Sequence, residues 1–139
     1  MIIGYTSGVF DLFHQGHVNF LKTARSMCDK LIIGVTTDEL SMDFKKKKPI
    51  VPSEERKSIV AAIRYVDLVI PQETMDKYGI WEQYKFDILF ASQSPTLQWK
   101  SVEGEFLSHF KDCQPPRIIY LPYTPGISSS IRRSIVENL

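Results

Sequence analysis

Five short runs of apolar residues, each bounded by glycine, proline or polar residues, constrain the fold of this chain more than any other feature. Almost every position within a run is apolar, a pattern typical of strands that are buried on both faces of a parallel sheet. Pro71 and Pro122 follow two of the runs directly and are expected to end those strands. The predicted strands cover residues 2–7, 31–36, 66–70, 87–91 and 117–121.

Amphipathic stretches alternate with these runs. In the first stretch, Val18, Leu21 and Ala24 recur at intervals of three to four residues, and Met27 widens the same stripe. Ser53 is predicted to cap a helix over residues 54–65. The residues expected to face inward from that helix are Ile59, Ala62 and Ile63, and further helices are expected over 78–84, 102–110 and 129–138.

The alternation of strands and helices predicts the fold class. It indicates an α/β protein with one doubly wound, Rossmann-like sheet of about five parallel strands and helices on both faces. No linker or internal repeat divides residues 1–139, so a single domain is expected. The 43% hydrophobic content provides enough apolar side chains for a substantial core.

Charge and cysteine content narrow the possible functions. A formal net charge of +1 gives no reason to expect nucleic acid or a membrane surface as a partner. No apolar run approaches the length of a membrane span, and no signal sequence is recognised, so a cytoplasmic location is expected. Cys28 and Cys113 lie too far apart in the sequence for a CxxC zinc site. Both are predicted to be buried, reduced residues.

The segment after the first predicted strand carries the strongest chemical signal. Ligands of doubly wound sheets bind beyond the carboxyl ends of the strands. There the sequence places His14, Gly16 and His17 where a loop enters a helix. A helix start offers unpaired N–H groups, glycine lets phosphate oxygens approach the backbone, and imidazole N–H groups can donate to them. Each histidine taken singly could instead be a helix cap or a surface residue.

The block Gly-x-Phe-Asp-x-x-His-x-Gly-His over residues 8–17 resembles the signature of the cytidylyltransferases in the His-x-Gly-His nucleotidyltransferase superfamily. Three further blocks occur in the expected order over nearly the whole chain. They are Thr-Asp-Glu at 37–39, Arg-Tyr-Val-Asp at 64–67 and Thr-x-Gly-Ile-Ser-Ser at 124–129. The resemblance is greatest to the small bacterial enzymes that use glycerol phosphate.

This resemblance implies roles for individual residues. The catalytic residues would be His14, His17, Arg64 and Lys45, the last a mobile lysine that closes over the triphosphate. Lys46 fits that role nearly as well and is expected to bind substrate. Asp11 belongs to the same substrate-binding set, and its carboxylate is expected to hold the loop rather than to act as a base. The nucleotide would contact Gly8, Val9, Phe10, Gly16, Thr124, Gly126, Ile127, Ser128 and Ser129.

Structural explanations compete with several of these roles. Arg64 can complement the C-terminal end of the preceding helix, four consecutive lysines at 45–48 can form a solvated loop, and one serine of 128–130 can cap the last helix. The sequence also departs from the family pattern. Tyr123 stands where relatives commonly have arginine, so Arg132 or Arg133 might substitute, and residues 91–94 read Ala-Ser-Gln-Ser in place of Gly-Asp-Asp-Trp.

The reaction implied by the resemblance joins CTP and a small phosphorylated alcohol to give a CDP-alcohol and pyrophosphate. Mg²⁺ is expected to be carried by the triphosphate with mostly water ligands and no protein ligand. A homodimer is expected, since relatives are often dimeric. The acceptor could be glycerol phosphate, another polyol phosphate, phosphocholine or phosphoethanolamine. Adenylyl transfer and a nucleotide-binding module without turnover are the remaining alternatives.

Overall fold

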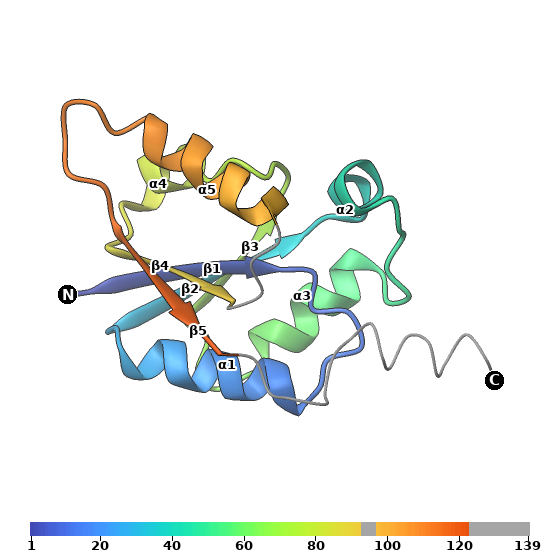
Figure 1. The fold of residues 1–139 in the computed structure, drawn as a ribbon. Coiled ribbons are helices and arrows are strands. Elements are labelled where there is room, and N and C mark those ends of the chain that lie inside the picture. The colour runs from blue at the N-terminus through green and yellow to red at the C-terminus, as the bar shows by residue number, and fades with distance from the viewer. Residues whose placement is uncertain (93–96, 123–139) are drawn as a thin grey trace.

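Five parallel strands form one sheet in the order β3-β2-β1-β4-β5 (Figure 1). The computed structural model describes residues 1–92 and 97–122, with the backbone alone for residue 45 and for 97–102. The predicted doubly wound α/β class is confirmed. The strands are β1 (Ile3–Gly8), β2 (Lys30–Thr36), β3 (Leu68–Gln72), β4 (Ile88–Ser92) and β5 (Arg117–Leu121).

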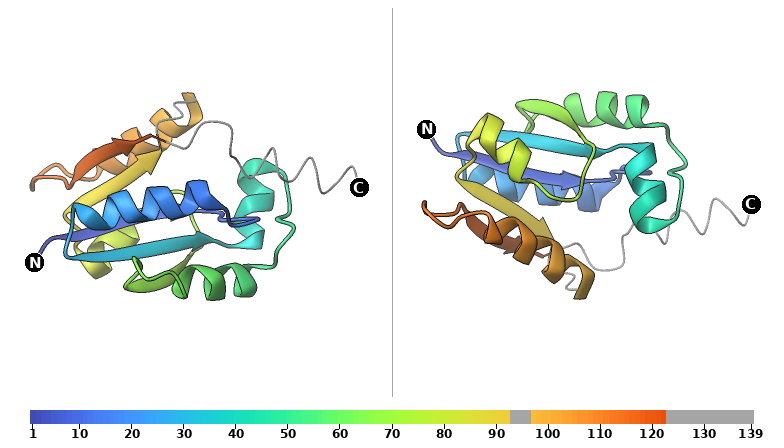
Figure 2. Two further views of the ribbon diagram at one scale, coloured as in Figure 1. Left: turned by 90° about the horizontal axis from the view of Figure 1, so that it is seen from below. Right: turned by 90° about the horizontal axis from the view of Figure 1, so that it is seen from above.

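Helices cover both faces of the sheet (Figures 1 and 2). Side chains alternate between the faces along each strand. Leu31, Ile33 and Val35 of β2 therefore join the core under α1 and α3, whereas Ile32 packs with Tyr5 on the α4 and α5 side. The helices are α1 (Gln15–Ser26), α2 (Asp38–Lys45), α3 (Ser53–Ala61), α4 (Tyr78–Tyr84) and α5 (Leu97–Ser108).

The sheet has its topological switch point between β1 and β4. The chain moves outward through β2 and β3 on one side and through β5 on the other. β1 pairs with β4 only at Gly4 and Tyr5, and beyond them Thr6 Oγ1 donates to the Phe90 carbonyl at 2.8 Å. Ligand sites in such sheets form at the switch point, beside the carboxyl ends of the strands.

Two strand and helix boundaries differ from the sequence prediction because of proline and arginine. β3 continues through Pro71, which lies opposite Val35. Proline is tolerated there because β3 is an edge strand and one of its sides needs no N–H donor. Helix α3 begins at Ser53 with Pro52 as its N-cap and ends at Ala61, so Ser53 is not the cap.

The inward face of α3 was also predicted wrongly. Arg56 and Val60 are the buried residues, whereas Ile59 is 37% exposed and Ala62 is exposed as well. Ile63 does pack against the core, as predicted. The error arose because a buried arginine occupies an inward position, and an apolar-periodicity argument assigns arginine to the solvent side.

Smaller corrections concern helix ends and single side chains. Helix α5 spans Leu97–Ser108 rather than 102–110, while α4 matches its predicted range. Cys28 is buried as predicted, but Cys113 is exposed. Met27 is 44% exposed and does not widen the buried stripe of α1. No helix in the described part of the chain is both long and apolar enough to cross a membrane.

Candidate active site

The two histidines of the sequence motif form the start of α1. His14 is the N-cap, and its Nδ1 accepts a hydrogen bond from the Gly16 N–H at 3.0 Å. His17 Nδ1 accepts from the His14 N–H at 3.1 Å. Together they make a reciprocal capping box in which two imidazoles replace the usual hydroxyl and carboxylate. The helix start predicted at this motif is confirmed, and its cap is one of the histidines.

These hydrogen bonds determine which nitrogen of each ring carries the proton. A neutral imidazole has one N–H donor and one acceptor nitrogen. Because Nδ1 of both His14 and His17 accepts from a backbone N–H, the proton of each neutral ring resides on Nε2. Both side chains thus act as N–H donors through Nε2, the property needed for contact with phosphate oxygens.

Aromatic packing holds the second ring in place. The ring centroids of His14 and His17 lie 4.0 Å apart with 25° between the planes. Phe13 stacks on His17 at 5.0 Å, and Phe10 approaches the same ring at 5.3 Å. A ring enclosed in this way loses rotational freedom before any ligand binds, which reduces the entropic cost of binding.

The loop between β1 and α1 has a constrained backbone. Phe10 and Leu12 have φ angles of 54° and 48°, in the left-handed region that costs non-glycine residues about 1 kcal/mol each. A Cβ on Gly8 would lie 3.0 Å from the Phe10 ring, so glycine is favoured there. Strain of this kind persists only where surrounding contacts impose the conformation.

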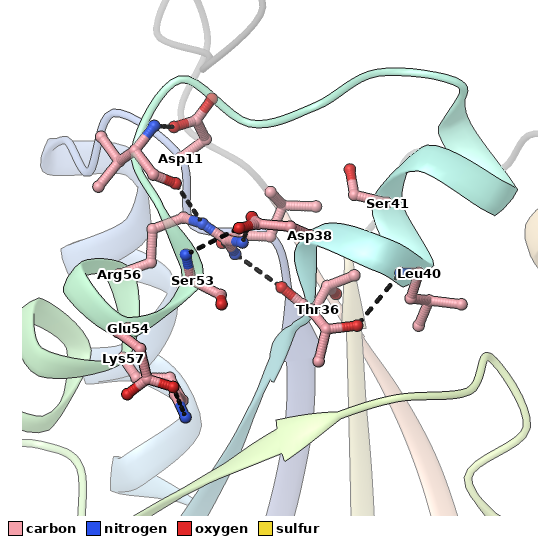
Figure 3. A network of polar contacts seen from close by, with 12 residues as sticks. Asp11, Thr36, Asp38, Leu40, Ser41, Ser53, Glu54, Arg56 and Lys57 are labelled. Atoms are coloured by element: carbon pink, nitrogen blue, oxygen red, sulfur yellow. Dashed lines mark hydrogen bonds and ion pairs between the residues drawn. The ribbon is translucent and has the colours of Figure 1, made fainter.

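Those contacts come from a polar network formed by Asp11, Asp38 and Arg56 (Figure 3). Arg56 is fully buried. Its Nη2 donates to Asp38 Oδ1 at 2.6 Å, and its Nη1 donates to the Val9 and Thr36 carbonyls, both at 2.7 Å. The guanidinium thereby joins the loop after β1 to the end of β2.

The network also holds the segment that follows the lysines. Asp11 Oδ2 accepts from the Ile50 N–H at 2.9 Å, and Oδ1 accepts from the Val51 N–H at 3.0 Å. Nε of Arg56 donates to the Val51 carbonyl at 2.8 Å. This is the loop-holding arrangement expected for Asp11, and contact between Asp11 and substrate stays a prediction.

Arg56 and its carboxylate partner are the residues that the sequence argument missed. A signal was present: a cation in the first turn of a helix opposes the helix dipole, so Arg56 needed a carboxylate or carbonyl partner elsewhere. Asp38 directly follows β2 and belongs to the Thr-Asp-Glu block. Its other oxygen, Oδ2, accepts from the Ser53 N–H at 3.3 Å.

The lysine run, residues 45–48, begins at the C-terminal end of α2. Lys46 is the C-cap in the left-handed conformation, with its N–H donating to the Met42 carbonyl at 3.1 Å. Ser41 Oγ donates to the Lys47 carbonyl at 2.8 Å. The side chains of residues 46–48 are exposed, and the run leads into the segment that Asp11 holds. The assignment of Lys45 or Lys46 to the triphosphate stays a prediction.

Arg64 lies away from the histidines. It follows the end of α3 and precedes β3, which places it at the amino ends of the strands, the opposite edge from His14. Its guanidinium lies 5.3 Å from the centre of the Tyr65 ring, and the residue is exposed. Within one chain the structure does not bring Arg64 together with the other predicted catalytic residues, so Arg56 is the arginine of this site.

A hollow at the carboxyl ends of β1, β2 and β3 adjoins the histidine loop. We call it the strand-end hollow. It measures about 320 Å³ when its open mouth is included. Helix α2 forms one wall, and Gly8 and Val9 belong to both the hollow and the loop. Its lining consists of Ser7, Gly8, Val9, Thr36, Leu40, Ser41, Phe44, Gln72 and Met75.

Part of the predicted site falls outside the described residues. Tyr123, Arg132 and Arg133 lie there, as do Thr124, Gly126, Ile127, Ser128 and Ser129 and the helix expected over 129–138. Among the residues that are described, no cluster of three His, Cys, Asp or Glu side chains is suited to a metal ion. Asp11 and Asp38 are engaged by N–H donors and by Arg56. These contacts fit a Mg²⁺ carried by the nucleotide, which stays a prediction.

The Cytidylyltransferase-like family matches residues 5–135, nearly the whole chain. This chain belongs to the Cytidylyltransferase-like family. The chain is similar to the glycerol-3-phosphate cytidylyltransferases of Bacillus subtilis and Staphylococcus aureus, with 38% and 39% identity. Each alignment covers 90% of this chain, together with 89% and 87% of the respective relative.

Another relative carries a different name. An FAD synthase of Thermococcus kodakarensis is 47% identical over 94% of this chain and 89% of its own length. Among solved structures, a lipopolysaccharide core biosynthesis protein from Thermoplasma volcanium has a TM-score of 0.77 at 22% identity, covering 89% of this chain and 98% of its own. That likeness shows the fold alone.

Proposed function

We propose that this protein transfers a cytidylyl group from CTP to a small phosphorylated alcohol, with glycerol phosphate as the best candidate, and releases pyrophosphate. The observation that carries the proposal is the paired-imidazole cap, which presents two Nε2–H donors at a helix start. Similarity to two glycerol-3-phosphate cytidylyltransferases over nine-tenths of the chain supports the choice of nucleotide and acceptor.

The proposed reaction is a direct displacement at phosphorus. An oxygen of the acceptor phosphate forms a bond to the α-phosphorus of CTP, and the bond from that phosphorus to the bridging oxygen of the β-phosphate breaks. The acceptor phosphate is anionic at neutral pH, so the attack requires no general base. Catalysis then comes from alignment and from stabilisation of charge on the α-phosphate and the departing pyrophosphate.

Each part of the site has a task in this reaction. His14 and His17 donate from Nε2 to phosphate oxygens, and their tautomers are set in advance by the backbone. Donors placed before the reaction act without reorganisation, and one of them is worth about 3 kcal/mol. The lysine run supplies positive charge beside the triphosphate. Mg²⁺, when bound to CTP, neutralises phosphate charge, with water as its main ligand.

A second candidate is adenylyl transfer. It is favoured by the 47% identity with the FAD synthase of Thermococcus kodakarensis, higher than the identity with either cytidylyltransferase. In this case ATP would replace CTP and the acceptor would be FMN, which is itself a phosphorylated polyol. The histidine chemistry is the same in both reactions, so the nucleotide must be tested directly.

The deciding experiment measures pyrophosphate release from CTP and from ATP against a panel of acceptors. The panel contains glycerol 3-phosphate, ribitol 5-phosphate, phosphocholine, phosphoethanolamine and FMN. Release from CTP with a phospho-alcohol supports the proposal. Release only from ATP with FMN overturns the cytidylyl assignment, and nucleotide binding without release in every pairing identifies a binding module. Light scattering of the same sample tests the expected homodimer.

A further inference from the structure

The strand-end hollow contains a buried amide that the reaction outlined above does not use. Gln72, the last residue of β3, is 1% exposed and lines the hollow. Its Oε1 accepts a hydrogen bond from the Tyr5 hydroxyl. Within residues 1–92 and 97–122, Nε2 of Gln72 has no hydrogen-bond partner. A buried amide donor is normally paired, so an unpaired one that lines a hollow points to a ligand.

The contact with Tyr5 determines which end of the amide is available. Tyr5 is completely buried, and its O–H proton needs an acceptor. Gln72 Oε1 is the acceptor found among the described residues. Burial also raises the pKa of the Tyr5 hydroxyl, so the hydroxyl keeps its proton and remains a donor. With Oε1 occupied in this way, Nε2 is left for the hollow.

The backbone of the neighbouring strand is shaped to accommodate this pair. A Cβ on Gly34 of β2 would lie 1.9 Å from the Tyr5 hydroxyl oxygen and 2.9 Å from Gln72 Oε1. Either distance is shorter than non-bonded atoms tolerate, so residue 34 must lack a side chain for the Tyr5–Gln72 contact to exist. The amide orientation is therefore imposed by three adjacent strands, β1, β2 and β3.

The chemistry of the hollow indicates which part of a substrate it can hold. None of its lining residues carries a charge. A phosphate would leave most of its charge without a partner there, and the adjoining helix start with His14 and His17 suits it better. A quaternary ammonium or amine would find no carboxylate and a single aromatic side chain, Phe44. A neutral group with hydroxyls fits, because Ser7, Thr36 and Ser41 add further hydroxyl groups to the lining (Figure 3).

We propose that Gln72, oriented by Tyr5, recognises a hydroxyl group of the acceptor alcohol by donating a hydrogen bond from Nε2 to the hydroxyl oxygen. This inference rests on the proposed function, since it assumes that the acceptor phosphate lies at the histidines while its alcohol portion enters the adjoining hollow. It makes Gln72 a specificity-determining residue that favours polyol phosphates over phosphocholine and phosphoethanolamine.

The test compares two acceptors that differ only in their hydroxyl groups. Glycerol 3-phosphate and propyl phosphate have the same carbon chain, and pyrophosphate release from CTP reports on both. A site built to bind a hydroxyl discriminates strongly against an analogue that lacks it. We expect the unmodified protein to favour glycerol 3-phosphate at least about a hundredfold in kcat/KM.

Three variants separate recognition from a structural role. Gln72→Leu keeps the approximate volume and is expected to lower the preference at least about tenfold, through kcat/KM for glycerol 3-phosphate alone. Tyr5→Phe, which frees the amide to rotate, should lower the preference by a smaller factor. Gln83→Leu makes the same substitution at an exposed position on α4 and should leave the preference unchanged. The KM for CTP checks that each variant is folded.

Several outcomes would overturn the inference. Equal losses with both acceptors in Gln72→Leu would show a structural role, and an unchanged preference would show no contact. A wild-type protein that uses phosphocholine better than glycerol 3-phosphate would refute recognition of a hydroxyl while cytidylyl transfer still holds. Absence of pyrophosphate release from CTP with every acceptor is the separate result that removes the proposed function, and the role of Gln72 with it.

Discussion

Two buried cations lie near the carboxyl edge of the sheet, and their surroundings are opposite. Arg56 is fully buried and donates to three carbonyls and one carboxylate. Lys77 is 7% exposed, and its Nζ has one long hydrogen bond, 3.4 Å to the Met75 carbonyl. The difference shows how a buried charge can be either a structural connection or a cost.

Geometry explains why the arginine is so well paired. A guanidinium is planar and directs its five N–H donors outward in a fixed fan, so it can reach several loops simultaneously. Arg56 uses this fan to join the segments around Val9, Thr36 and Val51. A lysine ammonium is a compact, strongly hydrated charge that loses more of its solvation when it is buried.

The lysine shows the consequence in its titration. Burial lowers the pKa of Lys77 from its ordinary value of 10.5, although nearby Glu103 and Asp76 act in the opposite direction. Desolvation therefore outweighs the attraction to these two carboxylates. At neutral pH the charged form of Lys77 costs the folded state free energy, whereas Arg56 connects the parts of the site.

The largest effect is expected from breaking the arginine network. Arg56→Met removes all four hydrogen bonds and leaves Asp38 without its cation, a loss of about 3–5 kcal/mol in unfolding free energy. Because the loop after β1 then loses its connection to β2, turnover should fall as well. Chemical denaturation measures the first quantity and pyrophosphate release the second.

Arg64→Met is the matched control for stability. Arg64 is exposed and contacts the Tyr65 ring, so its replacement should change the unfolding free energy by less than about 0.5 kcal/mol. Comparable losses in the two variants would contradict the distinction between a buried network and a surface cation. The turnover of Arg64→Met separately tests the catalytic role predicted for that residue.

His17→Ala is expected to have the next largest effect and to separate chemistry from structural connection. Loss of one Nε2–H donor should lower turnover at least about a hundredfold. The lost capping contact should reduce stability by only about 1 kcal/mol, well below the loss in Arg56→Met. Near-normal turnover in a folded His17→Ala protein would contradict the role of the paired imidazoles.

Much of the architecture was predictable because it depends on local signals. Apolar runs identified all five strands to within two residues at each end, and the His-x-Gly-His block identified the start of α1. The hydrogen bonds that make His14 the N-cap were not predictable. They depend on the side chain accepting from the backbone in place of serine or aspartate, the usual caps.

The parts of the site that sequence reasoning missed depend on tertiary contacts. Arg56 is separated by 18 positions from Asp38 and by 47 from Val9, and no local pattern pairs them. Tyr5 and Gln72 are 67 positions apart and meet because β1 and β3 flank β2. The expectation for Arg64 came from family resemblance, and the topology within one chain places that residue at the opposite edge of the sheet.

The smallest expected effect is a gain in stability, obtained by replacing the other buried cation. Lys77→Met retains most of the side-chain volume and removes the desolvated charge, so it should raise the unfolding free energy at pH 7 by about 1 kcal/mol. The folded protein binds the Lys77 proton more weakly than the unfolded chain does. The cost in the parent protein is therefore complete below the lowered pKa and disappears as the pH rises to the ordinary value of 10.5.

The advantage of Lys77→Met should thus shrink between neutral pH and 10.5, which denaturation at a series of pH values would measure. Lys22→Met on the exposed side of α1 provides the control, since it removes a lysine that is already in water and should show no such trend. If Lys77→Met were less stable than the parent at pH 7, the attraction of Glu103 and Asp76 would exceed the burial cost. The two buried cations would then both be stabilising, and the contrast between them would be one of degree.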